Sequence, residues 1–300
     1  MLEHADARTE RGDPPGTTSR PAARVHVALW SWLALGLVVA LLGTLFLVKV
    51  VGDPGSTATT LAPTSLQVFE EVTDVPAAVS DAVGVASPVV PIRPPTALTK
   101  GPLLTVRTEG GVRLPEVLYV GSEFCSFCAA ERWPLIIALS RFGSFNTLFE
   151  MQSSPVDYAP GTPTFSFYGT SYHSQYLVFH PFEVQSDVLG PHGYGTLMHV
   201  PDDVRAVLAR LDPTTVYPFV DVANRAVVLQ ANLSPETLAG LTRDEVAANL
   251  SDPTNTVTRA ILTAANELTA SICHADGQEP AAVCNSIGVR KADAVLRFAS

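Results

Sequence analysis

Cys125 and Cys128 form a CxxC pair in a chain of 300 residues that has only four cysteines. The pair follows a short apolar run at 116–120 that reads as a buried strand, and it precedes an apolar helical pattern at 126–142. A thiol at the start of a helix faces unpaired backbone N–H groups and the positive end of the helix dipole, which favour its thiolate. The spacing therefore predicts Cys125 as an exposed nucleophile with a lowered pKa, and Cys128 as a buried resolving cysteine one helical turn later.

Two other roles for the CxxC pair are half of a zinc site and a structural disulfide. Zinc would need two more ligands, and the sequence has no second CxxC, CxxH or HxxxH motif. Several histidines fall in the middle of the chain without the spacing of metal ligands, and we interpret them as surface or hydrogen-bonded residues: His173, His180, His192 and His199. We expect neither a metal nor a cofactor.

The elements around the pair follow from apolar periodicity and from turn formers. Gly143 is a candidate C-cap of the helix that starts after Cys125. Beyond it the pattern predicts strands at 147–151, 164–168 and 175–184, the last two joined at Gly169 into an inserted hairpin, and a helix at 202–211. After Ser234-Pro235 the chain is expected to be helical to its end.

Pro218 is a candidate cis-proline beside the cysteines. It opens a predicted strand at 219–223, which turns at Asn224-Arg225 and returns at 226–230. An ordinary trans-proline at the start of a strand is the alternative. In the cis reading, the backbone of Tyr217 would pair with the extended chain of a substrate.

Three segments resemble a known family: VLYVGSEFCSFCAAERWPLIIALSRFGSF, TPTFSFYGTSY and AANELTASICHADGQEPAAVC. The family is that of the membrane-anchored thioredoxin-like proteins of archaea and actinobacteria known as domain-of-unknown-function family 929, and the resemblance covers about residues 65–285. It implies an α/β protein with a thioredoxin-like fold, an insertion and a C-terminal helical extension, preceded by one transmembrane helix. A more distant resemblance to thioredoxins and periplasmic thiol oxidases implies that Cys125 is the nucleophile, Cys128 the resolving thiol and Pro218 the cis-proline.

The chain departs from the thioredoxin pattern at two positions. Phe124 precedes the first cysteine where thioredoxins have Trp, and Tyr119 stands where they have a buried Asp. The proton-relay role of that Asp could pass to Glu123, two residues before Cys125, or to Glu131, one turn after Cys128. For both glutamates a solvated surface position is the alternative that we favour from sequence.

Cys273 and Cys284 are the second cysteine pair, eleven residues apart on either side of a segment with turn-forming Asp276, Gly277 and Pro280. Outside a reducing compartment such a pair is expected to form a structural disulfide. A second redox couple that relays electrons to the CxxC pair is the alternative.

Residues 29–48 contain no charge and are long enough, at about 1.5 Å per residue, to cross the hydrocarbon core of a bilayer. Arginines dominate before this run, and Lys49 is the only basic residue between it and Arg93, so the positive-inside rule puts the N-terminus in the cytoplasm. We predict a cytoplasmic tail at 1–28, a transmembrane helix at 29–48, a linker at 49–64 and an extracytoplasmic domain at 65–300. A cleaved signal peptide is the alternative for 29–48.

The amino-acid composition and net charge exclude some classes of protein. A content of 47% hydrophobic residues excludes a disordered chain, and a net charge of −10 argues against a nucleic-acid partner. One hypothesis is a membrane-anchored, extracytoplasmic thiol–disulfide oxidoreductase that acts on the thiols or disulfides of exported proteins. Its partners would then be the lipid bilayer and a membrane redox protein. The other is a non-catalytic thioredoxin-fold binding module whose CxxC is structural.

Overall fold

The computed structural model describes residues 61–86, 90–296 and 298, and all of them belong to one compact unit, Thr59–Ser300. The predicted transmembrane helix at 29–48, the cytoplasmic tail and most of the linker lie outside the described residues. Within the described part of the chain, no helix is both long and apolar enough to cross a membrane.

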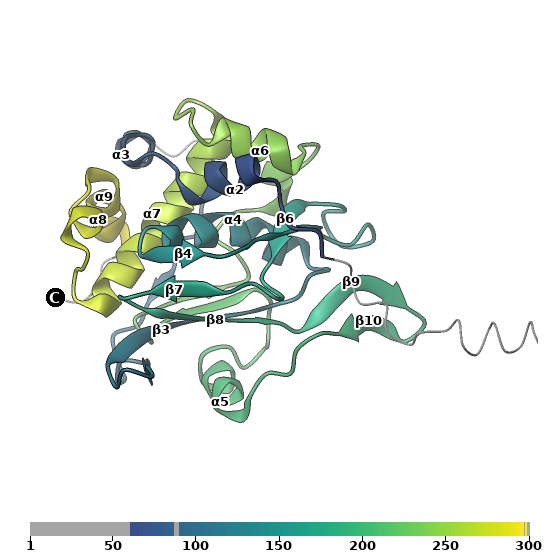
Figure 1. Cartoon of the computed structure of the whole chain (residues 1–300), viewed down its shortest axis with the longest axis horizontal. Helices are drawn as coiled ribbons and strands as arrows, with labels where there is room; N and C mark the ends of the chain where they lie inside the picture. The colour runs from purple at the N-terminus through teal and green to yellow at the C-terminus, as the bar shows by residue number, and fades with distance from the viewer. Residues whose placement is uncertain (1–60, 87–89, 297, 299–300) are drawn as a thin grey trace, which may run out of the picture. The chain divides into compact units, whose positions relative to one another are not determined.

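The described residues form a mixed α/β structure (Figure 1). The strands are β1 (Thr96–Ala97), β2 (Thr105–Arg107), β3 (Arg113–Gly121), β4 (Gly143–Phe145), β5 (Phe149–Gln152), β6 (Pro163–Ser166), β7 (Tyr172–Ser174), β8 (Val178–Glu183), β9 (Gln185–Gly190), β10 (Gly193–Thr196), β11 (Phe219–Val222) and β12 (Ala226–Leu229). The helices are α2 (Leu66–Thr73), α3 (Ala77–Val85), α4 (Ser126–Ser140), α5 (Asp202–Leu211), the 3₁₀ turn η1 (Pro235–Leu238), α6 (Arg243–Asn249), α7 (Thr256–Asp276), α8 (Ala281–Cys284) and α9 (Ile287–Leu296).

Strand β3 is the centre of a six-stranded mixed sheet with the order β1-β12-β11-β3-β2, in which β8 also pairs with β3. β11 runs antiparallel to β3, whereas β8 runs parallel to it from Glu116↔Val178 to Gly121↔Glu183. The carboxyl end of β3 is therefore enclosed by β11 on one side and β8 on the other. The loop that leads into α4 leaves the sheet from this enclosed end.

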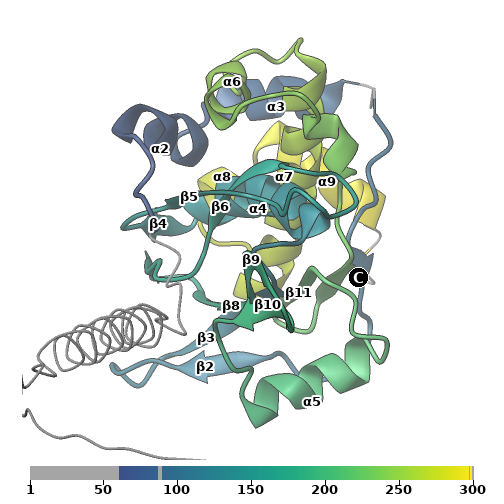
Figure 2. The ribbon, with the colours of Figure 1, turned by 90° about the vertical axis from the view of Figure 1, so that its right-hand side faces the viewer.

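Side chains of β3 alternate between two separate hydrophobic cores, one on each face of the sheet. Val117 and Tyr119 belong to the larger core, which includes the buried faces of α4 and α7. Leu118 and Val120 pack instead with Leu208 and other residues of α5. Period-two alternation along a strand explains this division, and Figures 1 and 2 show α4 and α7 on one side of the sheet and α5 on the other.

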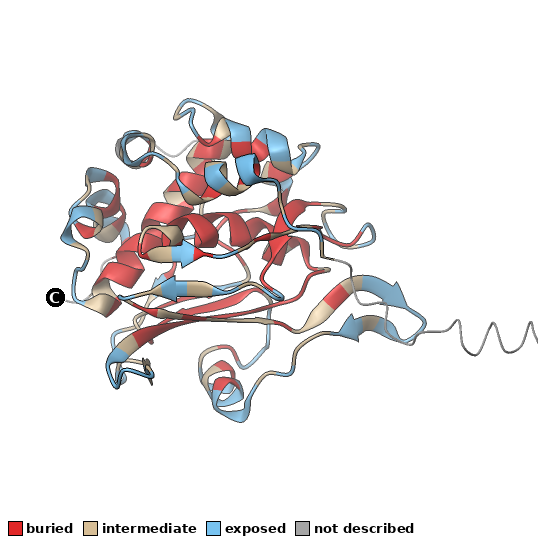
Figure 3. Cartoon of the chain, viewed as in Figure 1, coloured by how far each residue is buried: buried red, intermediate tan, exposed pale blue. Residues whose placement is uncertain are grey.

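Helices α4 and α7 form the buried centre of the larger core (Figure 3). Asn255 caps α7 by accepting from the N–H groups of Val257 and Thr258, and Gly277 ends it in the left-handed conformation with φ of 84°. The β9–β10 hairpin is much less buried than these helices, and its tip is largely exposed.

The hairpin predicted for 164–184 is wrong. β6 pairs with β5, the short strand β7 pairs with β4, and β8 joins the central sheet beside β3. The turn at Gly169 does form with a positive φ of 77°, but it does not pair the strands on its two sides. Leu177 and Phe179 are buried in the larger core, so burial against the rest of the domain decides the pairing of this segment.

Gly143 does not cap the preceding helix. Arg141 is the C-cap of α4, in right-handed helical conformation, and Gly143 already opens β4. A Cβ at Gly143 would lie 2.2 Å from the carbonyl oxygen of His173 on β7. Close approach of two strands is therefore what requires glycine here.

Two other local predictions are confirmed. The β11–β12 hairpin has the register Val222↔Ala226, with positive φ at Ala223 and Asn224 in its turn. The helix predicted at 202–211 is α5.

Cys273 and Cys284 form the disulfide that the sequence favoured, with Cα atoms 5.7 Å apart. Cys273 is near the end of α7 and Cys284 is at the end of α8, and both are buried. The pair fastens the last helical turns of the domain to the long helix that packs against α4.

We predict that replacing both Cys273 and Cys284 by Ser lowers the free energy of unfolding by about 3 kcal/mol, the loop-closure entropy expected for so short a loop. Urea unfolding of the oxidised protein measures the loss. The thiol reactivity of Cys125 should stay unchanged. A folded double variant whose Cys125 no longer exchanges thiols would instead make the pair a second redox couple.

Candidate functional site

Cys125 occupies the N-cap of α4, at the end of the short loop that follows β3. Its Sγ accepts a hydrogen bond from the backbone N–H of Cys128, with N···S of 3.2 Å. The Sγ of Cys128 accepts in turn from the N–H of Ser122, at 3.5 Å. Both sulfurs therefore accept from backbone N–H groups at the start of a helix, and the N-cap position of Cys125 favours its thiolate.

Pro218 lies next to the cysteine pair. The Tyr217–Pro218 peptide bond is cis, as predicted from the sequence. The thiol of Cys125 donates to the carbonyl oxygen of Tyr217, with S···O of 3.9 Å, across 92 residues of sequence. Pro218 is itself buried and directly precedes β11. The structure thus brings together Cys125, Cys128 and Pro218.

The two thiols differ in acidity. A hydrogen bond from the thiol of Cys128 lowers the pKa of Cys125 against the opposing effect of burial, and the backbone N–H of Cys128 and the charge of Arg132 act in the same direction. Burial raises the pKa of Cys128 well above that of a free thiol. These directions agree with a nucleophile at Cys125 and a resolving thiol at Cys128.

The prediction that Cys125 is exposed is wrong, because the side chain is buried. Its relative exposure is 8%, against 0% for Cys128. The loop between β5 and β6 covers it: the N–H of Ser154 donates to the carbonyl of Phe124, and the N–H of Ser126 donates to Oδ2 of Asp157 at 2.6 Å. The sequence did not indicate this loop because the contacts span about thirty residues.

Aromatic stacks flank the cysteine pair. Phe124 stacks on Tyr194 of β10 with ring centroids 4.0 Å apart, and Phe127 stacks on Tyr158 at 5.3 Å. Tyr158 is largely exposed. A groove of about 390 Å³ runs past this second stack, and its lining includes Phe127, Tyr158, Ile92, Asn232 and Ser234.

Arg132 and Glu183 form a fully buried ion pair near the cysteine pair. Nε and Nη2 of Arg132 donate to the two carboxylate oxygens of Glu183 at 2.9 and 2.7 Å. Nη2 also donates to the carbonyl oxygen of Ser122, and the guanidinium carbon lies 5.7 Å from the ring centre of Tyr119. Sequence reasoning missed this pair, although a charged residue within an apolar helix and another at the end of an apolar strand are signals that could have found it.

Glu123 is fully buried, so the surface position favoured from sequence is wrong. Its Oε1 accepts from the hydroxyl of Ser166 at 2.6 Å, and within the described part of the chain its Oε2 has no hydrogen-bond partner. Burial raises its pKa to about 7. The closing of β6 and β8 over this loop removes the carboxyl group from water.

Glu131 is also fully buried, and its predicted surface position is wrong as well. It faces away from Arg132, toward the backbone N–H of Asn232, which donates to Oε2 at 2.7 Å. Burial raises its pKa to about 8, and the nearby carboxylate of Glu267 on α7 adds to this shift. The packing of α7 on α4 excludes the solvent that the sequence interpretation assumed.

Tyr119, which the sequence resemblance aligned with the buried Asp of thioredoxins, is fully buried, and its hydroxyl has no hydrogen-bond partner among the described residues. Burial raises its pKa well above the ordinary value. A Cβ at Gly121 would lie 2.3 Å from this hydroxyl, so glycine is required where β3 ends. Asp221 of β11 is a buried acid too, with a pKa raised to about 7 by burial, but it lies with Phe219 on the α5 side of the sheet.

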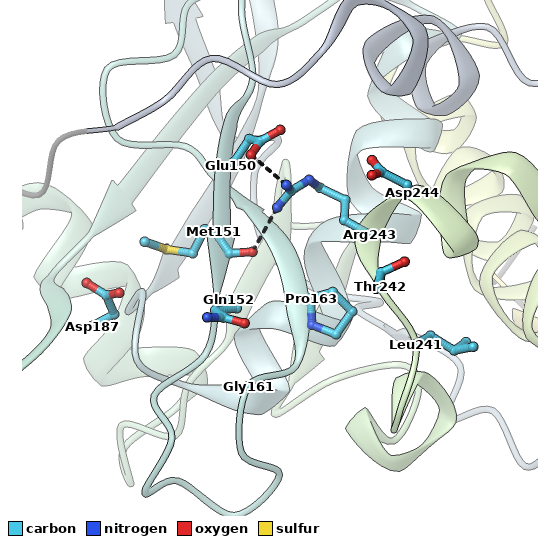
Figure 4. Close-up of a pocket in the computed structure, with 10 residues that line it drawn as sticks. All are labelled: Glu150, Met151, Gln152, Gly161, Pro163, Asp187, Leu241, Thr242, Arg243 and Asp244. Atoms are coloured by element: carbon cyan, nitrogen blue, oxygen red, sulfur yellow. Dashed lines mark hydrogen bonds and ion pairs between the residues drawn. The ribbon is translucent and has the colours of Figure 1, made fainter.

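A separate cavity of about 470 Å³ lies between β5, β6 and the start of α6 (Figure 4). Arg243 extends across it to pair with Glu150 at 2.7 Å and donates to the carbonyl of Met151. Neither cysteine of the CxxC pair lines this cavity. Throughout the described residues there is no group of three or more His, Cys, Asp or Glu side chains placed to hold a metal ion.

Comparison with known proteins supports the family resemblance for part of the chain. Residues 112–189 match the family model described as Domain of unknown function (DUF929). This segment contains the CxxC pair, Arg132 and Glu183. No curated protein and no solved structure matches the chain.

We predict that Cys125 of the reduced protein is alkylated first, with a midpoint pH below the value of about 8.5 for a free thiol. Iodoacetamide labelling across pH, with peptide mapping, measures both thiols. The Cys128→Ala variant should raise the midpoint of Cys125, because it removes the thiol that donates to its sulfur. Faster labelling of Cys128, or a free-thiol midpoint for Cys125, would contradict these roles.

We predict that Glu131 makes the protein less stable as the pH rises. Its pKa is about 8 in the folded protein and near 4.3 in an unfolded chain, so between these values the folded state binds a proton that the unfolded state has released. The free energy of unfolding then falls by up to about 1.4 kcal/mol per pH unit.

The Glu131→Gln variant keeps an acceptor for the N–H of Asn232 but cannot titrate. Urea unfolding between pH 5 and pH 8 should show a smaller loss of stability in this variant than in the wild type. Exposed Glu109 provides the control, because Glu109→Gln should leave the wild-type pH dependence unchanged. Equal slopes for Glu131→Gln and the wild type would refute the prediction.

Proposed function

We propose that the protein is a thiol–disulfide oxidoreductase whose reactive group is the Cys125–Cys128 pair. The observation that carries the proposal is the position of Cys125, at the N-cap of α4 and 3.9 Å from the carbonyl oxygen that precedes Pro218. The opposite pKa shifts of the two thiols are those that a nucleophile and a resolving thiol need.

The proposed exchange starts from the Cys125–Cys128 disulfide. A substrate thiolate attacks Sγ of Cys125, the bond between the two protein sulfurs breaks, and Cys128 leaves as a thiolate that takes up a proton. A second substrate thiolate then attacks the substrate sulfur of the mixed disulfide, and Cys125 leaves as a thiolate. The substrate loses two electrons, and the protein gains them; reduction of a substrate is the reverse sequence.

Within this mechanism we assign the proton relay to Glu123 rather than to Glu131. Glu123 precedes Cys125 by two residues. Its charged neighbours are Glu183, Arg132 and Asp187, and of these Arg132 also acts on both thiols. Its Oε2 has no hydrogen-bond partner among the described residues, so a lone pair or a proton on this oxygen is not committed to another group. Glu131 instead faces Asn232 and Glu267, on the side of α4 toward α7.

The substrate that fits this surface is an extended polypeptide segment with a cysteine. A strand-like segment can pair with the backbone of Tyr217, which precedes β11. The groove of about 390 Å³ beside Phe127 and Tyr158 offers an aromatic surface for the neighbouring substrate residues. Backbone pairing with a sequence-tolerant apolar contact suits an enzyme that accepts many exported proteins.

We further propose a thioredoxin-like fold for the domain. The arrangement that supports it has the CxxC pair between β3 and α4, β8 parallel to β3, and an antiparallel β11–β12 hairpin after the cis-proline. Helices cover both faces of this sheet. In this proposal β4 to β7 and the β9–β10 hairpin are additions around the shared core.

We place this domain on the extracytoplasmic side of the membrane, anchored by residues 29–48. The support is the uncharged run and the arginines that precede it. A disulfide at Cys273–Cys284 suits the same compartment. The electrons would pass between the CxxC pair and a membrane protein that carries a disulfide or a quinone.

The alternative is a non-catalytic binding module with a structural CxxC pair. The low exposure of Cys125, at 8%, favours it, because a substrate sulfur must reach Sγ directly. The two hypotheses differ in one measurable respect: only an oxidoreductase forms a covalent intermediate through Cys125.

We predict that the Cys128→Ser variant traps a mixed disulfide with a cysteine-containing peptide, because the second thiol that would release it is gone. Non-reducing mass spectrometry after incubation with an activated peptide disulfide detects the adduct on Cys125. The Cys125→Ser variant should trap at least tenfold less. The variant with Ser at both 273 and 284 is the matched control and should retain trapping when combined with Cys128→Ser.

The opposite result would support the binding module. If Cys128→Ser stays folded and forms no adduct at pH 8 within hours, while the denatured variant does react, Cys125 is closed to substrates.

A further inference from the structure

The Arg132–Glu183 pair is closed to solvent on every side, since both side chains have 0% exposure. The guanidinium makes two hydrogen bonds to the carboxylate and one to the carbonyl of Ser122, while no described residue bonds to its Nη1. Replacing a buried ion pair with apolar residues of similar volume often leaves stability unchanged or raises it. Stability alone is therefore a poor explanation for a charge at this place.

The geometry connects the guanidinium to the thiol. Arg132 is four residues after Cys128 on α4, so the two side chains share one face of the helix. Ser122 joins them: its N–H donates to Sγ of Cys128, and its carbonyl accepts from Nη2 of Arg132. A positive charge this near, in a medium without water, acts on a thiolate much more strongly than it would at the surface.

The other charged and titratable groups around the thiols come from several elements. Tyr119 on β3 interacts electrostatically with both thiols, Tyr217 with Cys128, and Asp157 in the β5–β6 loop with Cys125. Glu183 on β8 is the partner of Arg132. Arg132 lowers the pKa of both cysteines against these acids. No other basic side chain is among the main electrostatic influences on either thiol.

We infer that Arg132 is a positioning residue that makes the Cys125–Cys128 couple oxidising, and that Glu183 moderates this effect. The inference rests on the proposed function and adds that the protein oxidises its substrate. The preferred substrate is then a pair of free thiols on an exported protein. The disulfide form of the couple carries no charge, whereas the reduced form carries the Cys125 thiolate. A buried cation stabilises the reduced form alone, and a couple with a stabilised reduced form is a stronger oxidant.

The substrate dithiol loses two electrons and two protons and becomes a disulfide. The Cys125–Cys128 disulfide takes up both electrons and one proton, which leaves a thiolate at Cys125 and a thiol at Cys128. The second proton goes to solvent, and a membrane oxidant of the disulfide or quinone class later removes the two electrons.

Variants that change the two charges separately test the inference. Glu183→Gln keeps the guanidinium and removes its counter-charge, so the equilibrium constant for oxidation of glutathione should rise about tenfold, or about 30 mV in reduction potential. Arg132→Met should change the constant about tenfold in the opposite direction. The midpoint pH for alkylation of Cys125 should fall in the first variant and rise in the second.

Arg132→Met leaves Glu183 buried without a partner and could fail to fold. In that event Glu183→Gln is compared with the Arg132→Gln/Glu183→Gln double variant. Both variants lack the carboxylate, but only the Glu183→Gln single variant keeps the guanidinium. The single variant should then be about tenfold more oxidising than the double variant. The control is Arg141→Met, which removes a guanidinium from the C-cap of the same helix, about 20 Å along its axis from Cys128, and should leave the potential unchanged.

The outcomes separate the two proposals. If the wild-type protein reaches no redox equilibrium with glutathione, the proposed function fails and this inference fails with it. If the wild type equilibrates but the two charge variants shift together, or do not shift, only the inference is overturned. Opposite shifts with an unchanged Arg141→Met potential support it.

Discussion

The junction between β3 and α4 is the constraint on which the rest of the domain depends. β3 is held by β11 on one side and by β8 on the other, so the loop after Gly121 has one direction in which to leave the sheet. Ser122, the first residue of this loop, then makes two hydrogen bonds to α4: its N–H donates to Sγ of Cys128, and its carbonyl oxygen accepts from Nη2 of Arg132. The start of α4, and with it Cys125, is fixed relative to the sheet by hydrogen bonds between the backbone of Ser122 and side chains of α4.

Successive residues of α4 serve different parts of the molecule. Glu131 faces α7 and the segment after β12, whereas Arg132 faces β8 and the cysteine pair. Both are fully buried in a helix whose other buried residues are mostly apolar. A proton at Glu131 relieves the cost of burying its charge, while Arg132 keeps its charge because Glu183 compensates it. The two neighbours show how one helix can hold a neutral acid and an ion pair.

The surroundings of Cys125 combine reactivity with restricted access. The thiol and the backbone N–H of Cys128, together with Arg132, favour the Cys125 thiolate, but Cys125 is only 8% exposed. The β5–β6 loop and the stack of Phe124 on Tyr194 lie beside it. These covering elements connect to the helix mainly through Ser154 and Asp157, which bond to the backbone around Cys125. An oxidoreductase built this way would select substrates by the shape of the opening as well as by their thiols.

The sequence by itself determined what depends on neighbours along the chain. The CxxC pair at a helix start, the β11–β12 hairpin after Pro218, helix α5 and the proximity of Cys273 to Cys284 all follow from caps, turn formers and short spacings. Tertiary structure alone decided the pairing of β8 with β3, the close approach that requires Gly143, the burial of Glu123 and Glu131, and the contact of Arg132 with Glu183, 51 residues apart. Periodicity shows that a face is apolar but not which element covers it, because strand partners and buried charges are chosen by contacts between distant segments.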